Sequence, residues 1–160
     1  MYRIGFGTDI HRLVSGRPLI LGGVEIESDL GAEGHSDADA LTHAITDAIL
    51  GAVALGDIGS HFPDTDERWH GADSFVFLRQ AVASARSLGY IVVNLDSTIS
   101  LQSPKLQPHI DKIRDTIAGV LKVDRNCISV KAKTGEGVDA VGERRAIRAE
   151  SIVLLKRTNL

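Results

Sequence analysis

Residues 41–55 constrain the fold of this 160-residue chain more than any other segment, because apolar side chains recur there every three or four positions. That spacing places them on one face of an α-helix, and such a face must be buried against another layer. Ser36 and Asp39 resemble a capping box before the run, and Gly56 stands where a left-handed cap would end the helix. The apolar positions are Leu41, Ala44, Ile45, Ala48, Ile49, Ala52 and Leu55. We therefore predict a long helix that packs on a second layer.

Alternating patterns predict that second layer. Residues 2–6 alternate between apolar positions and polar or glycine positions, which is typical of a strand, here ending near residues 8–11. Gly22 and Gly23 separate two short apolar runs and suit the turn of a β-hairpin. Periodicity also predicts helices at 75–88 and 110–121, and strands at 128–133 and at 91–101, whose odd-numbered residues form its drier face. Residues 146–156 suit either a helix or a strand, and the apolar run 151–155 favours a strand. The expected fold is of the α/β (α+β) class, a mixed sheet with helices packed on it and a small hairpin.

The composition indicates an ordinary globular protein, with 43% hydrophobic and 24% charged residues. The length suits one domain, residues 1–160. The single cysteine, Cys127, excludes an internal disulfide and a multi-cysteine metal site, so a reducing compartment is expected. The longest apolar run, 48–56, is far shorter than the ~20 residues that span a bilayer, and no targeting peptide is visible. We expect a cytoplasmic protein that does not contact membranes.

Charge is distributed unevenly along the chain. Residues 1–104 carry 6 basic and 14 acidic side chains, whereas residues 105–160 carry 12 and 7. An acidic part that binds cations and a basic part that binds an anion would suit a metal-dependent enzyme acting on phosphates. The alternative is an uneven solvated surface. Neither part is basic enough to indicate a nucleic-acid partner.

Three residues have the spacing of a metal centre. Asp9 and His11 are two positions apart at the end of a predicted strand, so their side chains project to the same face. His43 lies on the polar edge of the predicted helix. Zinc accepts imidazole nitrogens and carboxylate oxygens, and a catalytic zinc keeps three protein ligands and one open position. The alternative is structural: a capping aspartate, a surface histidine and a helix histidine that is hydrogen-bonded.

Two more carboxylates, Asp39 and Asp47, lie one helical turn before and after His43. They are candidates to orient the imidazole of His43. The alternative is that both are solvated helix charges.

Two loops are candidates for phosphate contacts. His35 and Ser36 precede the long helix, where free N–H groups and the helix dipole attract anions, although Ser36 could simply cap the helix. Thr134 opens a glycine-rich loop, in which Glu136 offers a carboxylate to a hard cation such as Mg²⁺. Lys105 is a further candidate, or else an exposed lysine.

Several segments together resemble the 2-C-methyl-D-erythritol 2,4-cyclodiphosphate synthase family, and the resemblance covers nearly the whole chain. The segments occur in the family's order, and no single one of them is decisive. They are GFGTDIH at 5–11, HSDAD at 35–39 with His43, TDA at 46–48, LGDIG at 55–59, FPDTD at 62–66, PKL at 104–106 and PH at 108–109.

The resemblance implies a phosphorus–oxygen lyase of non-mevalonate isoprenoid precursor biosynthesis. Its substrate would be 4-diphosphocytidyl-2-C-methyl-D-erythritol 2-phosphate, and its products 2-C-methyl-D-erythritol 2,4-cyclodiphosphate and CMP. The substrate's own 2-phosphate would attack the β-phosphorus. The resemblance also implies a homotrimer with active sites between subunits.

The resemblance further assigns roles to individual residues. Asp9, His11 and His43 would hold Zn²⁺ or another divalent cation, and Glu136 would hold Mg²⁺ or Mn²⁺ with the substrate diphosphate. His35 and Thr134 would stabilise the transition state. The substrate-binding residues would be Asp9, His11, His35, Ser36, Asp57, Ile58, Gly59, Phe62, Pro63, Asp64, Thr65, Asp66, Leu101, Pro104, Lys105, Leu106, Gln107, Ala132, Lys133, Thr134 and Glu136.

The chain departs from the family pattern in the late loop, where Ala140 and Glu143 replace the usual Phe and Arg. Contacts made by those two family residues are not transferred, and the neighbouring Arg144 and Arg145 are candidate replacements. Two other functions fit the same residues. One is a metal-dependent phosphohydrolase, and the other is a non-catalytic nucleotide-binding module with a structural metal. Structural zinc usually has four protein ligands, which favours an enzyme.

Overall fold

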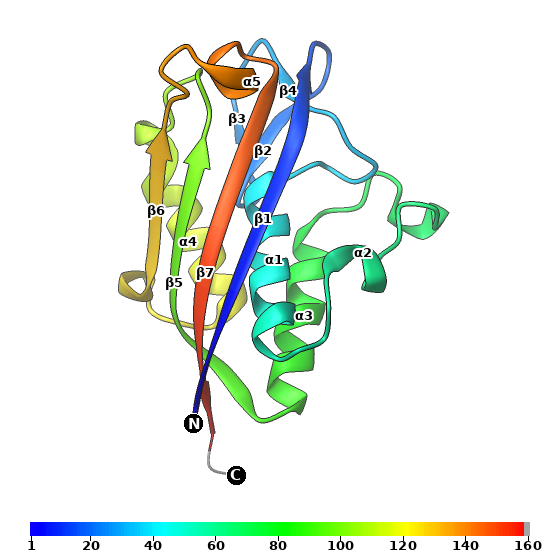
Figure 1. The fold of residues 1–160 in the computed structure, drawn as a ribbon, viewed down its shortest axis with the longest axis vertical. Helices are drawn as coiled ribbons and strands as arrows, with labels where there is room; N and C mark the ends of the chain where they lie inside the picture. Colours follow the sequence, from blue (N-terminus) through cyan, green and yellow to red (C-terminus); the bar gives the residue numbers. More distant parts are fainter. Residues whose placement is uncertain (159–160) are drawn as a thin grey trace.

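The computed structural model describes residues 1–158 of the chain; residues 159 and 160, the last two of the expected domain, lie outside the described residues. Five strands form the main sheet, in the order β4-β1-β7-β5-β6 (Figure 1). Strands β5 and β6 pair in parallel and the other neighbours pair antiparallel, which confirms the predicted mixed sheet. The strands are β1 (Tyr2–Val14), β4 (Gly31–Ala32), β5 (Tyr90–Ser100), β6 (Ile128–Lys133) and β7 (Ala146–Arg157).

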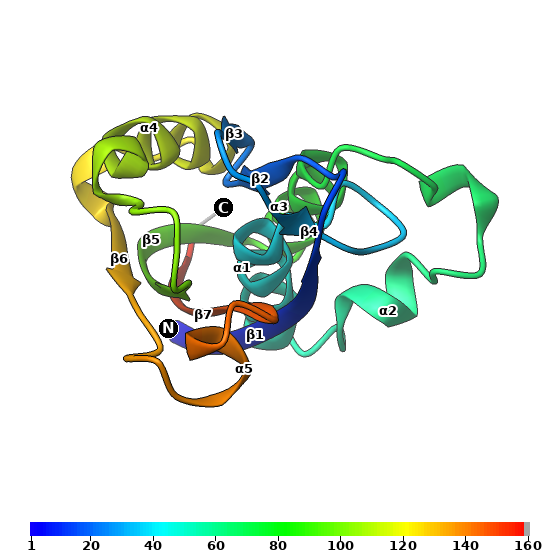
Figure 2. The same ribbon diagram turned by 90° about the horizontal axis from the view of Figure 1, so that it is seen from above.

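Helices and a hairpin cover one face of this sheet. The predicted hairpin is β2 (Leu19–Leu21) and β3 (Val24–Ile26). In Figure 2, α1 lies within the curve formed by β5, β7 and β1. None of the helices within residues 1–158 has both the length and the apolar character needed to cross a bilayer. The helices are α1 (Ala40–Ala52), α2 (Ile58–His61), α3 (Phe75–Ser87), α4 (Ile110–Leu121) and α5 (Asp139–Gly142), with short 3₁₀ turns at Glu67–Trp69, Gln107–His109 and Arg125–Cys127.

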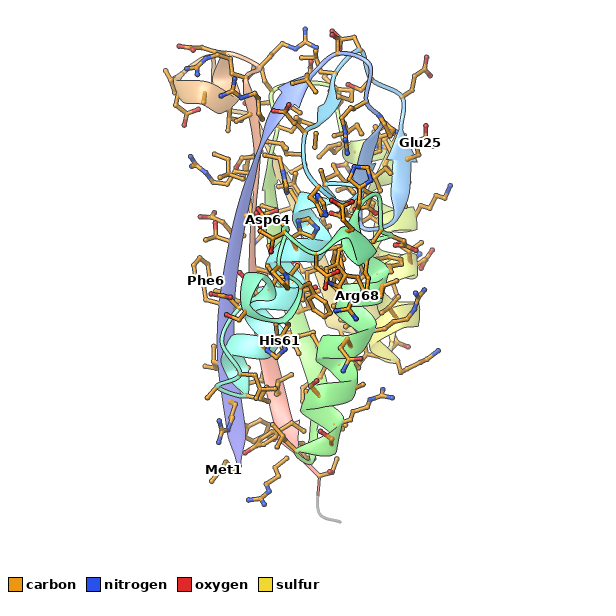
Figure 3. The ribbon with its side chains drawn as sticks, turned by 90° about the vertical axis from the view of Figure 1, so that its right-hand side faces the viewer. Met1, Phe6, Glu25, His61, Asp64 and Arg68 are labelled. Atoms are coloured by element: carbon orange, nitrogen blue, oxygen red, sulfur yellow. The ribbon has the colours of Figure 1, made fainter. Side chains whose placement is uncertain are left out.

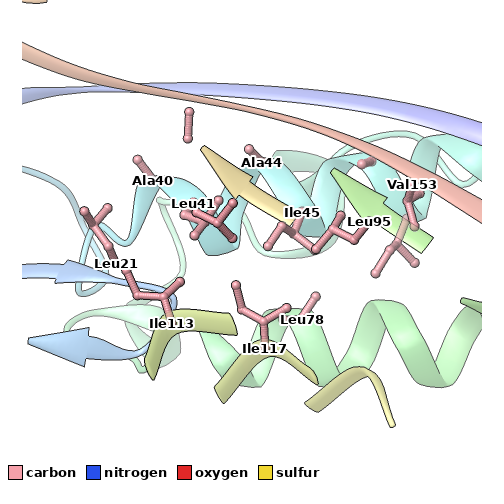
Figure 4. Close-up of a cluster of buried hydrophobic side chains, with 14 of the residues drawn as sticks. Leu21, Ala40, Leu41, Ala44, Ile45, Leu78, Leu95, Ile113, Ile117 and Val153 are labelled. Atoms are coloured by element: carbon pink, nitrogen blue, oxygen red, sulfur yellow. The ribbon is translucent and has the colours of Figure 1, made fainter. Parts of the chain in front are cut away.

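The core fills the space between α1, the sheet and the outer helices. Leu41 and Ile45 of α1 meet Leu95 of β5 on one side and Ile117 of α4 on the other, and all four side chains are fully buried (Figure 4). Because the sheet, α3, α4 and the hairpin surround α1, most of its residues are buried, not only the predicted stripe. This arrangement is the predicted α/β (α+β) class.

Both ends of α1 differ from the prediction. Asp39, not Ser36, is the N-cap, and its carboxylate accepts a hydrogen bond from the backbone N–H of Thr42. At the other end the N–H of Leu55 bonds to the carbonyl of Leu50, so Ala54 occupies the left-handed position that the sequence assigned to Gly56. The helix therefore ends at Ala52, and the residues after it are free to form a loop.

The apolar side chains of β1 from Tyr2 to Ile10 face away from the core, whereas Leu13, near the end of the strand, is buried in it. Gly5 and Gly7 face α1 so closely that an added Cβ would lie 1.8 Å from the carbonyl oxygen of Ala48 and 2.0 Å from that of Ala44. Since only glycine permits this approach, the bulky alternate residues occupy the outer face, where Phe6 is 59% exposed and points away from the helices (Figure 3). The strand also continues to Val14, beyond its predicted end.

The drier face of β5 changes parity at a bulge. The register with β7 shifts between Val92 and Asn94. Even-numbered residues therefore face the core before the bulge, and odd-numbered residues face it afterwards. Val92 is buried and Ile91 is 41% exposed, contrary to the prediction that odd-numbered residues are drier throughout. From Leu95 onwards the predicted parity is confirmed.

Candidate metal centre and adjoining pockets

Asp9, His11 and His43 meet between β1 and α1. Asp9 and His11 share the inner face of the strand, and the helix brings His43 towards them. The Oδ2 atom of Asp9 lies 2.8 Å from Nε2 of His11 and 3.0 Å from Nδ1 of His43, and the two nitrogens are 3.2 Å apart. Their candidate ligand atoms all lie within 4.8 Å of one another. The predicted cluster is therefore confirmed as a possible metal site.

The outward nitrogen of His11 fixes the ring's tautomer. Nδ1 lies 2.7 Å from the carbonyl oxygen of Glu33, which only accepts hydrogen bonds, so Nδ1 donates. The neutral ring then presents the lone pair of Nε2 to the cluster. A carboxylate and an imidazole lone pair facing the same point suit a divalent cation, which is the usual partner of such donors.

Mutual electrostatics in the cluster shift two pKa values. Burial alone would raise the pKa of Asp9, but hydrogen bonds and charge attraction from His11 and His43 outweigh it and hold that pKa well below its usual value. Burial would lower the pKa of His11, but the neighbouring Asp9 carboxylate outweighs it and raises the pKa above the usual value. Asp9 is therefore ionised at neutral pH, and a metal at this site competes with protonation of His11.

Neither flanking carboxylate of α1 orients His43. Asp39 is fully buried and accepts hydrogen bonds from the N–H groups of Gly22 and Gly23, at 3.0 and 2.8 Å, besides capping α1. Burial raises the pKa of Asp39, and these hydrogen bonds offset part of that rise. Asp39 thus joins the hairpin turn to the start of α1, so both predicted roles, an orienting carboxylate and a solvated charge, are wrong.

Asp47 holds the loop that follows α1. Its Oδ1 accepts a 2.7 Å hydrogen bond from the N–H of Ile58, the first residue of α2. Partial burial raises the pKa of Asp47. Because α2 carries predicted substrate residues, Asp47 sets the position of the loop relative to the metal centre.

A pocket of about 430 Å³ opens beside the metal centre. The segment before α1, the loop 57–66 and the start of α3 form its walls. Nine predicted site residues line it, namely His11, His35, Ser36, His43, Ile58, Gly59, Phe62, Pro63 and Asp64. We call this the metal-side pocket.

Three predicted residues of the same loop are near the pocket but are not among those that line it. Asp57 caps α2 by accepting hydrogen bonds from Ser60, which lower its pKa. Asp66 pairs with Arg68, which lowers the pKa of Asp66. Thr65 is exposed.

Aromatic side chains that were not predicted form one wall of the metal-side pocket. Trp69 and Phe77 line the metal-side pocket, and both rings pack on Phe62, with centroid distances of 5.3 and 4.7 Å. Phe77 falls outside the apolar stripe that predicted the second helix. The only signal for its role was that it is an apolar residue on the side of α3 away from that stripe.

A second pocket, of about 170 Å³, lies at the far edge of the sheet. It shares no lining residue with the metal-side pocket. Three strand spacings separate β1 from β6, roughly 14 Å at the usual distance between strands. The lining residues are Leu101, Gln102, Pro104, Lys105, Leu106, Gln107, Ala132, Lys133 and Thr134, all within the segments 101–107 and 132–134 that the resemblance assigns to the cytidine and its phosphates. We call this the edge pocket.

Thr134 lines the edge pocket, and Glu136, the predicted ligand of a second cation, lies two residues further along the chain. The hydroxyl of Thr134 donates a 2.9 Å hydrogen bond to the exposed carboxylate of Glu136. His35 lines the metal-side pocket, so one chain does not bring His35 and Thr134 together. Glu136 likewise lies outside the cluster of Asp9, His11 and His43.

The unusual residues of the late loop, Ala140 and Glu143, lie just before the first residue of β7. The carboxylate of Glu143 accepts a 2.7 Å hydrogen bond from Arg145, and Arg144 pairs with Asp29. Ala140 lines a further pocket together with both arginines. Within the described chain, both candidate replacement arginines are therefore already paired with carboxylates.

Comparison with known proteins gives the same picture over nearly the whole chain. The YgbB family model matches residues 2–156. A relative from Chromobacterium violaceum, named 2-C-methyl-D-erythritol 2,4-cyclodiphosphate synthase, is 57% identical, and the match covers 97% of this chain and 98% of the relative. A solved structure of such a synthase in a CDP-bound form is 44% identical, with a TM-score of 0.90, and the match covers 96% of this chain and all of that one.

The fold also matches part of a larger protein. The bifunctional IspDF from Campylobacter jejuni is 40% identical, with a TM-score of 0.95; the match covers 99% of this chain but only 43% of that one. This chain therefore corresponds to one portion of the bifunctional protein. The fold, the converging Asp9, His11 and His43, and these similarities together place the chain in the YgbB family, among the 2-C-methyl-D-erythritol 2,4-cyclodiphosphate synthases.

Proposed function

We propose that this chain converts 4-diphosphocytidyl-2-C-methyl-D-erythritol 2-phosphate to 2-C-methyl-D-erythritol 2,4-cyclodiphosphate and CMP, as a cytoplasmic enzyme whose residues 1–160 act as one domain. The observation that carries the proposal is the cluster of Asp9, His11 and His43 at the mouth of a pocket, in a chain 57% identical to a synthase of that name. A relative in the same family binds CDP.

The reaction needs positioning more than a protein nucleophile. An oxygen of the substrate's 2-phosphate forms a bond to the β-phosphorus, and the bond from that phosphorus to the CMP oxygen breaks. Attack within one molecule gains about 7–11 kcal/mol when the reacting groups are held in line. The pocket walls therefore have to fold a flexible chain into a ring-like conformation.

The donor set of the cluster fits Zn²⁺, which Asp9, His11 and His43 would hold as three protein ligands. Glu136, an exposed carboxylate beside Thr134, would hold Mg²⁺ or Mn²⁺ with the diphosphate. When bound, these cations would neutralise negative charge on the phosphate oxygens.

The remaining residues divide between the two pockets. His35, Ser36 and the loop 57–66 would bind the methylerythritol phosphate next to the metal centre. The edge pocket would bind cytidine and its phosphates, through Lys105, the backbone of residues 101–107 and the end of β6. His35 and Thr134 would donate hydrogen bonds to the phosphate oxygens as charge develops.

A homotrimer would bring these pockets together. The outer face of β1 and β7 exposes a patch of large apolar side chains, including Ile4 at 72% exposed and Phe6 at 59%, beside Ile152 of β7. An apolar patch of this kind marks an interaction surface. Closed threefold packing on this face would place the edge pocket of one copy beside the metal-side pocket of its neighbour.

The test is to incubate the purified chain with the diphosphocytidyl substrate, with and without a chelator, and to identify the products by ³¹P NMR. Formation of the cyclic diphosphate and CMP, lost on chelation, is the expected result. Orthophosphate or an opened diphosphate without the cyclic product would indicate a phosphohydrolase. Binding without turnover would indicate a nucleotide-binding module.

A further inference from the structure

The two ring nitrogens of His43 lie in different surroundings. Nδ1 faces Asp9 and His11, whereas Nε2 lies 2.7 Å from the hydroxyl oxygen of Ser74. Ser74 is 1% exposed, so water does not reach this contact. Ser74 is also the N-cap residue of α3, yet its hydroxyl makes no capping hydrogen bond. A serine in this position commonly caps the helix, so its hydroxyl here serves another partner.

Asp37 determines where the hydroxyl hydrogen of Ser74 points. The carboxylate of Asp37 accepts hydrogen bonds from the backbone N–H of Ser74, at 3.0 Å, and of Asp39, at 3.1 Å. The hydroxyl of Ser74 makes a further, short contact with the same carboxylate. A carboxylate only accepts, so the single hydroxyl hydrogen of Ser74 points to Asp37. The hydroxyl oxygen of Ser74 can then only accept a hydrogen bond from His43, so Nε2 of His43 carries a proton and donates it to that hydrogen bond.

Backbone hydrogen bonds fix this arrangement. The N–H of Asp37 bonds to the carbonyl of Ala72, at 3.1 Å, and the N–H of Gly71 bonds to the carbonyl of His35, at 2.8 Å. The segment before α1 and the segment before α3 are thus joined on both sides of the contact between Asp37 and Ser74. The direction of the hydrogen bond to His43 follows from the folded backbone.

We propose that Ser74 and Asp37 are positioning residues for the metal centre. Through the chain His43 Nε2–H to Ser74 to Asp37, they keep the proton on Nε2 and leave the lone pair of Nδ1 free to bind the metal. The inference rests on the proposed metal site and deepens it. The carbonyl of Glu33 likewise keeps a proton on the outward nitrogen of His11. In both histidines, a partner on the side away from the metal therefore determines which ring nitrogen is free to bind it.

Zinc affinity and histidine NMR test this role without turnover. Ser74→Ala removes the acceptor; loss of such an outer partner commonly weakens metal binding 10–100-fold. The hydroxyl of Ser36 remains 3.2 Å from Nε2, so we expect a loss of about tenfold in a chelator competition. Ser97→Ala is the matched control, because Ser97 is equally buried and bonds Ser151 away from the site.

The second readout is the Nε2 proton of His43 in zinc-loaded protein labelled with ¹⁵N-histidine. We expect this proton to be resolved and slow to exchange in the wild type and in Ser97→Ala, and to exchange rapidly in Ser74→Ala. Zinc affinity of Ser74→Ala within threefold of the control, or an unchanged Nε2 proton signal, overturns the proposal.

Two further outcomes keep the test decisive. Absence of the Nε2 proton in the zinc-loaded wild type also overturns the proposal, and that measurement needs no variant to fold. Failure of the wild type to bind zinc would instead reject the proposed metal site, so the two failures are distinguishable.

Discussion

The metal-side pocket and the edge pocket differ in how much of their structure one chain provides. Around the metal centre, His43 is 8% exposed, Ser74 is 1% exposed, and each ring nitrogen of the two histidines has a partner. At the edge pocket, Lys105, Lys133 and Thr134 are exposed, and within residues 1–158 the hydroxyl of Thr134 has hydrogen bonds with Glu136 alone. One pocket is organised in advance, and the other is open.

This difference indicates what each pocket requires. A metal needs ligands at fixed positions, and burial with outer hydrogen bonds supplies them. A flexible nucleotide can be bound by an open surface that a neighbouring subunit completes. The contrast therefore predicts that substitutions at the two pockets have different consequences.

The largest expected effect is at the metal-side pocket. His43→Ala removes a ligand, and metal assistance supplies several kcal/mol of transition-state stabilisation. At one factor of ten per 1.36 kcal/mol, turnover should fall by about 10³-fold or more. Turnover by ³¹P NMR, bound zinc by chelator release and mass by light scattering measure the result. Retained turnover in a zinc-free variant would remove His43 from the ligand set.

The next effect tests the surface between subunits. Phe6→Asp places a charge on the apolar outer face of β1 and should dissociate the proposed trimer, because burying that charge in the proposed interface is costly. Turnover should fall more than for any single substitution in the edge pocket. Dissociation would remove every contact of the edge pocket with the neighbouring metal-side pocket at once. Light scattering gives the mass. Leu88→Asp is the control, because Leu88 is similarly exposed but lies at the end of α3, and it should stay trimeric.

A smaller effect is expected at the edge pocket. Thr134→Val removes one hydrogen-bond donor at similar volume, and losing such a donor costs about 10²-fold in turnover. Because the two pockets of one site would come from different copies, co-expression of His43→Ala and Thr134→Val chains should restore activity. Random trimers would keep about a quarter of the wild-type sites.

The control for this experiment combines two variants of the same pocket. Co-expressed His43→Ala and Asp9→Asn chains should show no restoration. If Thr134→Val and His43→Ala also fail to complement in mixed trimers, the two pockets do not form a shared site.

The smallest effect is the dependence of zinc binding on pH. Asp9 raises the pKa of His11, so in the zinc-free protein this group stabilises the fold below pH 6.5 and loses that contribution as pH rises through the folded-state pKa. Zinc displaces the proton, so its affinity should rise by up to about tenfold per pH unit below that pKa. The difference in melting temperature between the zinc-loaded and the zinc-free protein should therefore increase from pH 6 to pH 8.

His11→Gln tests the assignment of this pH dependence. The variant should bind zinc weakly and show little change in the melting-temperature difference with pH. A pH dependence as steep as that of the wild type would assign the effect to another group.

Much of this fold and of the metal centre could be predicted from local patterns. The spacing of Asp9 and His11 on a strand, and of His43 on an amphipathic helix, was enough to propose a shared ion, because both periodicities fix where side chains point. The hairpin at Gly22-Gly23 follows from turn chemistry alone. The family resemblance supplied the division of residues between two pockets, which no local pattern indicates.

The errors came from tertiary contacts. Asp39 has the same spacing from His43 as an orienting carboxylate would. Its oxygens instead accept hydrogen bonds from the hairpin turn, whose Gly23 lies sixteen residues earlier in the chain. Ser74 and Phe77 serve the metal-side pocket only because α3 packs beside α1. The parity of β5 changed at a bulge that depends on its pairing with β7. In each case a distant segment decided the outcome.

The glycine face of β1 has one more consequence. Odd-numbered residues contribute Gly5, Gly7, Asp9 and His11 to the interior, and even-numbered ones contribute the apolar outer side. Deleting one residue between Gly7 and Asp9 would put the residues before and after the deletion on opposite parities, so the glycine face with its apolar outer side and the metal ligands could not both keep their sides. Catalysis and assembly would then be lost together, so this segment should tolerate changes of residue far better than changes of length.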